Sequence, residues 1–142
     1  MGVRFLLNLV FLSVLAAACA FPSAAQNKQE KKLQATEGAD LYKQNCAVCH
    51  GNDGKGNGPP PKDSPYKEAP PDLTALAQGN KGKFPDAYVE DVLRSGVKLA
   101  DHGSAEMPVW GTVFKAVTKS DESQVKQRIS SLTSYLKSIQ QK

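Results

Sequence analysis

The chain has 142 residues, of which 40% are hydrophobic and 23% charged, and its formal net charge is +4. A chain of this length suggests a single domain. The positive balance is too small to indicate a nucleic-acid partner, although unevenly placed charge can still steer docking between proteins.

The first twenty residues have the layout of a secretory signal peptide. A single positive charge, Arg4, precedes an apolar run over residues 5–18, and small residues follow it. A membrane-spanning helix needs about 20 apolar residues. This run is shorter, so a retained transmembrane anchor is the weaker interpretation. We therefore expect export, with residues 1–20 as the signal.

The end of the signal is open to three interpretations. The small-x-small pattern of a cleavage site occurs before Phe21 and again before Gln26. The sequence LAAAC also resembles a bacterial lipobox, although Ala16 stands where leucine is usual. In that case Cys19 becomes a lipidated first residue that tethers the protein to a membrane. Stable anchoring needs more than one acyl chain, and bacterial lipoproteins as a family meet that need. Otherwise Cys19 leaves with the signal.

The first helix of the domain is predicted to begin at Thr36. Residues 21–35 are polar, charged and poor in large apolar side chains, which is typical of a flexible linker. Thr36 belongs to the residue types that cap helices. The apolar stripe that follows runs into the sequence CAVCH and ends at Gly51. We expect the domain to cover residues 36–142.

Two further helices and a short turn are predicted after a loop rich in Gly and Pro over residues 51–72. A helical turn follows Asp72, and a helix lies between Pro85 and Gly96, with Tyr88, Val89, Val92 and Leu93 as its buried stripe. Ser120 can cap the last helix, whose apolar residues recur at helical spacing: Val125, Ile129, Leu132, Leu136 and Ile139.

The predicted fold class is all-α, with three to five helices and long irregular loops. We find neither a convincing strand nor an internal repeat in the sequence. The predicted helices contain few bulky apolar residues to fill a core. In addition, a loop as long as residues 51–72 is normally evidence against an ordered, compact domain. A large buried apolar group would supply the missing volume and give the loop something to wrap.

The sequence CxxCH, at Cys46, Cys49 and His50, is the signature of covalent c-type haem attachment. Two thiols one helical turn apart reach two vinyl groups of one macrocycle, and the histidine that follows is held beneath the iron. A zinc site normally takes four ligands, a thioredoxin-like dithiol belongs in a βαβ context, and a structural disulfide leaves the long loops unexplained. The residues favour one haem c with His50 as proximal ligand.

The sequences GADLYKQNCAVCHGNDGKGNGP, PPDLT and EMPVWG together resemble the small mono-haem c-type cytochromes, class I-like, of bacterial electron-transfer chains. The resemblance covers residues 36–142. It implies the small cytochrome c fold around one covalently bound haem. It also implies a protein of the bacterial periplasm, soluble or lipid-anchored, that carries single electrons between redox partner proteins by Fe(II)/Fe(III) cycling and is not an enzyme by itself.

The resemblance further implies a distal methionine ligand from a late loop. Met107, the single methionine after the signal, lies in such a loop and is followed by Pro108, which stiffens it. Met/His ligation raises the reduction potential of haem iron. His102 is the rival ligand, and we interpret it as a solvated loop residue.

The resemblance also points to residues around the ligands. A proline carbonyl accepts the second N–H of the ligating histidine in this family, and Pro71 matches that role, with Pro70 as the alternative. Trp110 is a further candidate for contact with the haem, with ordinary core packing as the alternative. Five lysines are interpreted as solvated surface, with guidance of an acidic partner as the alternative: Lys43, Lys55, Lys81, Lys83 and Lys98.

Two other functions stay open from the sequence. The domain can be the haem subunit of a larger dehydrogenase, oxidase or reductase, so the protein is expected as a monomer or as a subunit of a complex. A haem enzyme or sensor with a labile sixth ligand is the third alternative. Neither the electron donor nor the acceptor can be named from the sequence.

Overall fold

The computed structural model describes residues 24–58, 69–96 and 107–141. Residues 1–20, the cleavage position before Phe21 and the predicted lipidation of Cys19 lie outside the described residues, as do His102 and Lys98.

The chain divides into two units, Met1–Glu30 and Lys31–Lys142. The described part of the first unit is helical over residues 24–30, and its side chains from Gln26 to Glu30 are exposed. The second unit holds the core and all of the predicted site residues. Within the described residues, no helix combines the length and the apolar character that crossing a bilayer requires.

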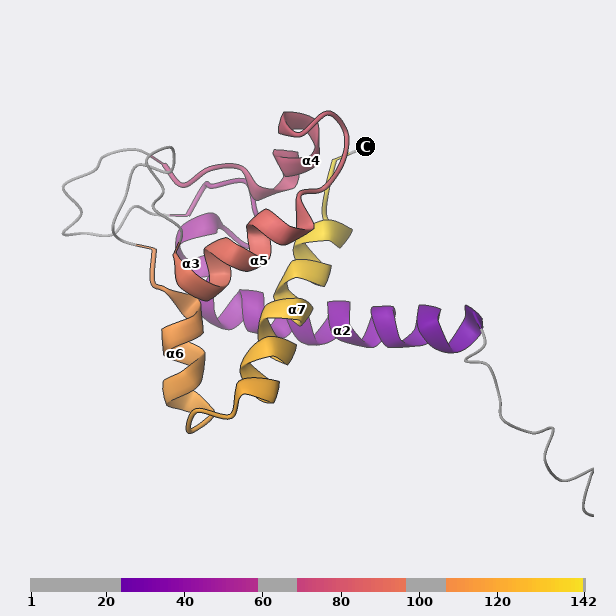
Figure 1. The fold of residues 1–142 in the computed structure, drawn as a ribbon. Coiled ribbons are helices and arrows are strands. Elements are labelled where there is room, and N and C mark those ends of the chain that lie inside the picture. The colour runs from indigo at the N-terminus through magenta and orange to yellow at the C-terminus, as the bar shows by residue number, and fades with distance from the viewer. Residues whose placement is uncertain (1–23, 59–68, 97–106, 142) are drawn as a thin grey trace, which may run out of the picture. The chain divides into compact units, whose positions relative to one another are not determined.

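The described residues form helices and no strand (Figure 1), which confirms the all-α prediction. In chain order the elements are α2 (Ala24–Asn45), α3 (Ala47–His50), the 3-10 turn η1 (Leu73–Ala75), α4 (Leu76–Gly79), α5 (Asp86–Ser95), α6 (Trp110–Val117) and α7 (Glu122–Ser138).

Helix α2 begins well before Thr36, where the sequence predicts the first helix to start. Residues 24–35 are helical rather than the flexible linker expected from their polarity. They are rich in Ala, Gln, Lys and Glu, which are strong helix formers, and they contain no Gly or Pro. The Thr36 hydroxyl donates to the carbonyl of Lys32 at 3.0 Å, so Thr36 lies inside the helix and does not cap it. The domain boundary at residue 36 stays a prediction.

Helix α5 has the predicted bounds, because Pro85 precedes its first residue and Gly96 ends it in the left-handed conformation, with φ 56°. Its buried stripe is narrower than predicted. Val89 and Leu93 are buried, whereas Tyr88 is 43% exposed. Val89 and Leu93 are four residues apart and so share one face of the helix, while Tyr88 is turned about 100° away from Val89.

Helix α7 is capped by Asp121, not by Ser120 as predicted. The Asp121 carboxylate accepts from the backbone N–H of Ser123 at 2.9 Å and of Gln124 at 3.2 Å. A carboxylate at this position satisfies two otherwise unpaired N–H groups and lies at the positive end of the helix dipole. These hydrogen bonds lower the pKa of Asp121 to about 2.

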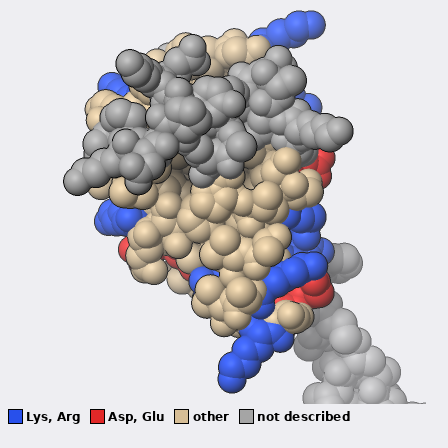
Figure 2. Space-filling model, turned by 90° about the vertical axis from the view of Figure 1, so that its left-hand side faces the viewer, with Lys and Arg blue, Asp and Glu red and all other residues tan. Residues whose placement is uncertain are grey.

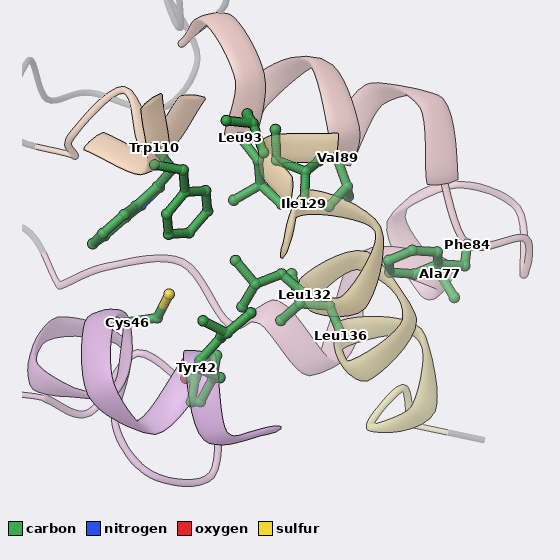
Figure 3. Packing of buried hydrophobic residues seen from close by; sticks show 13 residues of the cluster. Tyr42, Cys46, Ala77, Phe84, Val89, Leu93, Trp110, Ile129, Leu132 and Leu136 are labelled. Atoms are coloured by element: carbon green, nitrogen blue, oxygen red, sulfur yellow. The ribbon is translucent and has the colours of Figure 1, made fainter. Parts of the chain in front are cut away.

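The core lies between α7 and its neighbours α5, α6 and α2. Helices α5, α6 and α7 all contact one another, and Figure 3 shows their buried side chains meeting those of α2. The buried hydrophobic residues on these four helices are Leu41, Tyr42, Val89, Leu93, Trp110, Phe114, Val125, Ile129, Leu132 and Leu136. Four of the five predicted α7 residues are therefore core, and Ile139 packs against it.

Helices α2 and α7 cross at Gly38. A β-carbon at Gly38 would overlap the backbone carbonyl of Ser131 and lie 2.8 Å from the Tyr135 Cβ. Beside this crossing, the rings of Tyr42 and Tyr135 lie with centroids 5.1 Å apart. Glu37 accepts a hydrogen bond from the Ser131 hydroxyl at 2.9 Å. The close approach of the two helices therefore depends on a missing side chain.

Candidate haem site

The CxxCH sequence forms one tight turn between α2 and α3. Cys46 lies at the joint of the two helices, and its carbonyl accepts from the backbone N–H of Cys49 at 3.1 Å and of His50 at 2.9 Å. Gly51 ends the turn with φ 77°, as predicted. The two thiols and the imidazole therefore belong to a single helical turn, which is the spacing that covalent attachment to one macrocycle requires.

This turn has an interior side and a solvent side. Cys46 and His50 are each only 9% exposed, while Val48 between them is 66% exposed. The Cys46 sulfur points away from its own helix, towards the side on which Trp110 lies (Figure 3). Cys49 is half-buried. The chemically active side chains are thus directed inward from the turn.

The surroundings of the two cysteines do not favour a redox dithiol. No disulfide joins Cys46 to Cys49. Burial, with the nearby Cys49 adding to it, raises the pKa of the Cys46 thiol to about 12. Catalytic dithiols need a lowered pKa, because the thiolate is the nucleophile. The folded environment therefore argues against thioredoxin-like chemistry.

A glycine-rich loop follows His50 and folds back onto it. The Gly56 N–H donates to the His50 carbonyl at 2.9 Å, and the buried Tyr42 hydroxyl donates to the Gly51 carbonyl at 2.7 Å. Gly56 has φ 74°, and a β-carbon there would overlap the Pro70 carbonyl oxygen. Glycine at this position therefore lets the two prolines lie against the loop that follows His50.

The sequence PPDLT starts the next helical turn, as predicted. The Asp72 carboxylate caps η1 by accepting from the Thr74 N–H at 2.8 Å and from the Thr74 hydroxyl at 2.6 Å. The same hydrogen bonds lower the pKa of Asp72. Leu73 and Leu76 pack against the core. That the Pro71 carbonyl accepts a hydrogen bond from the imidazole N–H of His50 stays a prediction.

Trp110 belongs to the buried cluster that contains Cys46, and Met107 packs against that cluster. Met107 is half-buried. Trp110, the first residue of α6, is 8% exposed, and its ring centroid lies 5.7 Å from that of Phe114. The structure thus brings both residues to the core that borders the CxxCH turn. A direct role for Trp110 at the haem stays a prediction.

The side chains present fit an iron porphyrin better than a bare metal ion. Among the described residues, no group of three or more His, Cys, Asp or Glu side chains is placed to hold a metal ion. An iron porphyrin leaves only two axial positions to the protein. One imidazole and one thioether, each from a different segment, match that need. Residues Cys46 and Cys49 would hold the macrocycle and His50 the iron.

The described fold and the CxxCH turn define a helical protein of the c-type haem class. The family model for cytochrome c matches residues 35–140, so the chain belongs to the cytochrome c family. Cytochrome c-551 of Bacillus subtilis (strain 168) is 35% identical to it over 85 residues, which are 56% of this chain and 76% of that protein. No solved structure matches the chain. The protein is a small c-type cytochrome, a haem-binding electron-transfer protein with covalently bound haem c.

Two features of the site region escaped prediction. Helix α6 was not expected, although Trp110, Phe114 and Val117 recur at helical spacing and offered a signal. The second feature is the contact of Gln140 and Gln141 with the segment after Pro70. Polar residues at the end of a helix carry no pattern that identifies a distant partner, so no sequence signal was available for this contact.

Proposed function

We propose that this cytochrome carries single electrons between redox partner proteins, with one haem whose iron is bound by His50 and Met107. The observation that supports it most is the packing of Met107 against the core cluster to which Cys46 belongs. A haem bound here supplies the Fe(II)/Fe(III) couple. With both axial positions filled by the protein, no position is left for a substrate.

Each site residue then has a distinct task. Cys46 and Cys49 attach the haem through thioethers, and the helical turn holds His50 directly after them. The Met107 thioether is a soft ligand that favours ferrous iron and so raises the potential. Pro71, or Pro70 beside it, accepts from His50 and fixes the orientation of the imidazole.

The proposed location is the bacterial periplasm, and the proposed partners are proteins. The signal-like residues 1–20 support export. The protein is then soluble there or tethered to a membrane through lipidated Cys19. On the face shown in Figure 2, the described Lys and Arg side chains lie around an area of uncharged side chains, and acidic ones are few. Such a face favours an acidic partner.

A spectroscopic comparison of wild type with Met107→Ala tests the ligand assignment. The oxidised wild-type protein is expected to show the far-red band of sulfur bound to ferric iron, and Met107→Ala to lose it. Val109→Ala, which removes an exposed side chain from the same loop, should keep it. A wild type without the band, or a Met107→Ala protein that retains it, contradicts Met107 as the ligand.

Two further measurements separate the remaining alternatives. An alkaline-pyridine spectrum of ordinary haem b would contradict covalent attachment through Cys46 and Cys49. Rapid binding of carbon monoxide to the reduced wild type at neutral pH would instead indicate a labile sixth ligand, as in a haem enzyme or sensor. Co-purification with a large flavin, quinone or metal subunit would indicate a complex subunit rather than a free carrier.

A further inference from the structure

Gln140, which follows α7, is bonded to the PPDLTALA segment (residues 70–77). Its side-chain oxygen accepts from the Ala77 N–H at 2.8 Å. Its side-chain nitrogen donates to the Leu73 carbonyl at 2.8 Å and to the Leu136 carbonyl at 2.7 Å. All three bonds are partly buried. One side chain therefore joins the end of α7 to both η1 and α4.

Gln141 adds a second set of bonds to the same segment. Its backbone N–H donates to the Thr74 carbonyl at 2.9 Å. Its side-chain nitrogen donates to the Thr74 hydroxyl at 2.6 Å. Thr74 is itself buried and bonded to Asp72, which directly follows Pro71. The two glutamines together bond the backbone of the PPDLTALA segment at Leu73, Thr74 and Ala77.

The other side of the PPDLTALA segment lies against the loop that follows His50. The Leu73 N–H donates to the Gly54 carbonyl at 2.7 Å, and the Gly56 N–H donates to the His50 carbonyl at 2.9 Å. The Pro70 carbonyl lies against Gly56 without space for a β-carbon. The segment that contains both prolines is thus held between the glutamines and the backbone of the haem-binding turn.

The strength of the hydrogen bond from a ligating histidine to a carbonyl tunes the basicity of the imidazole, and hence the metal. That strength depends on where the carbonyl is held. We propose that Gln140 and Gln141 are positioning residues, which hold the Pro70–Pro71 carbonyls in place beside His50 and thereby tune the reduction potential. This inference rests on the proposed function, because it takes His50 as the iron ligand.

The direction of the effect follows from the chemistry of the ligand. A firm hydrogen bond makes the imidazole a stronger electron donor, which stabilises ferric iron. When the glutamines are removed, the PPDLTALA segment loosens and this bond weakens on average. The midpoint potential is then expected to shift in the positive direction.

The experiment uses the holo-cytochrome with three variants. Gln140→Ala removes the three partly buried side-chain bonds of Gln140. Gln141→Ala is the milder change, because two of the three bonds it removes are exposed and 3.4 Å long, and it covers the case in which the first variant folds poorly. Gln127→Ala is the matched control, since Gln127 lies on α7 but bonds to Glu37 at 3.2 Å instead. The readouts are amide hydrogen exchange at Leu73 and Ala77, the midpoint potential and the far-red sulfur–iron band.

We expect exchange at Leu73 and Ala77 to accelerate about tenfold in Gln140→Ala and less in Gln141→Ala. The potential should shift in the positive direction in the same order, with the far-red band intact and with Gln127→Ala unchanged. Faster exchange without a shift in potential, a negative shift, or no change in either quantity overturns the proposal. A wild type without covalent haem or without the band overturns the proposed function instead.

Discussion

Gly38 on α2 lies directly against the backbone carbonyl of Ser131 on α7, in a contact that has no space for a β-carbon. This contact sets how closely the first and last described helices cross. Both sides of it are backbone, so neither can move aside by changing a rotamer. The Tyr42 and Tyr135 rings contact each other beside it, tilted by 46° at a centroid distance of 5.1 Å, so a change in the crossing distance is transmitted to the core.

Gly38→Ala is therefore expected to destabilise the protein by about 2 kcal/mol or more, because the added methyl group must push α2 away from α7. The measurement is chemical denaturation of the holo-protein. Gly79→Ala is the control, since a β-carbon at Gly79 meets nothing within 4 Å. Gly79→Ala should be neutral or slightly stabilising. Equal effects of the two substitutions would show that the crossing is less tight than the structure indicates.

Tyr42→Phe tests the hydrogen bond between α2 and the loop after the CxxCH turn. The Tyr42 side chain is fully buried, and its hydroxyl donates to the Gly51 carbonyl at 2.7 Å. Removing the hydroxyl is expected to lower the free energy of unfolding by about 1 kcal/mol, because the buried carbonyl loses its shorter hydrogen bond and keeps only the one from the Gly54 N–H at 3.3 Å. Tyr135→Phe is the control, because it keeps the ring contact with Tyr42. Its loss of stability, measured by thermal unfolding, should be smaller than that of Tyr42→Phe.

Much of the fold and of the site was predictable because the relevant signals are local. The helix end at Gly96, the apolar spacing of α7 and the CxxCH turn each follow from a few neighbouring residues. The start of α2 was not predicted, because polar composition alone does not distinguish a linker from a helix of strong helix formers. Likewise, the bonds of Gln140 to Leu73 and Ala77 join segments distant in the chain, and only the folded topology brings them together.

The Asp121 cap of α7 predicts how the stability of the fold changes at acid pH. Asp121 has a pKa lowered to about 2 from its ordinary value of 3.8, through hydrogen bonds from Ser123 and Gln124. Because the folded-state value is the lower one, the carboxylate stabilises the fold above about pH 4, and this contribution is lost as the pH falls towards 2. Asp121→Ala should lower the Tm by about 4 °C at pH 7.

The pH dependence distinguishes a charged cap from a merely polar one. Asp121→Asn keeps a side-chain oxygen at the cap but cannot ionise, so its Tm should lie between those of wild type and Asp121→Ala at pH 7. The difference between Asp121→Asn and wild type should shrink as the pH falls from 4 to 2. A difference that stays constant over this range would show that the charge of Asp121 does not contribute.

Two glycines with nearly the same positive φ allow the cost of backbone strain to be measured separately from the cost of steric overlap. Gly56 has φ 74° and Gly82 has φ 79°, so an alanine at either position meets the same left-handed backbone penalty. A β-carbon at Gly82 meets nothing within 4 Å, whereas one at Gly56 overlaps the Pro70 carbonyl. Gly82→Ala is expected to cost about 1 kcal/mol, and Gly56→Ala about 3 kcal/mol or more, because the overlap adds to the strain.

Gly56→Ala should also change the surroundings of His50. The added methyl group forces the Pro70 carbonyl away from Gly56, whose N–H donates to the His50 backbone carbonyl at 2.9 Å. Denaturation with guanidinium chloride measures the stability of both variants, and redox titration measures their midpoint potentials. The potential should shift in Gly56→Ala and stay at the wild-type value in Gly82→Ala. If both variants lose the same stability and keep the same potential, then Gly56 serves only the backbone conformation and the approach of Pro70 has no effect on the haem site.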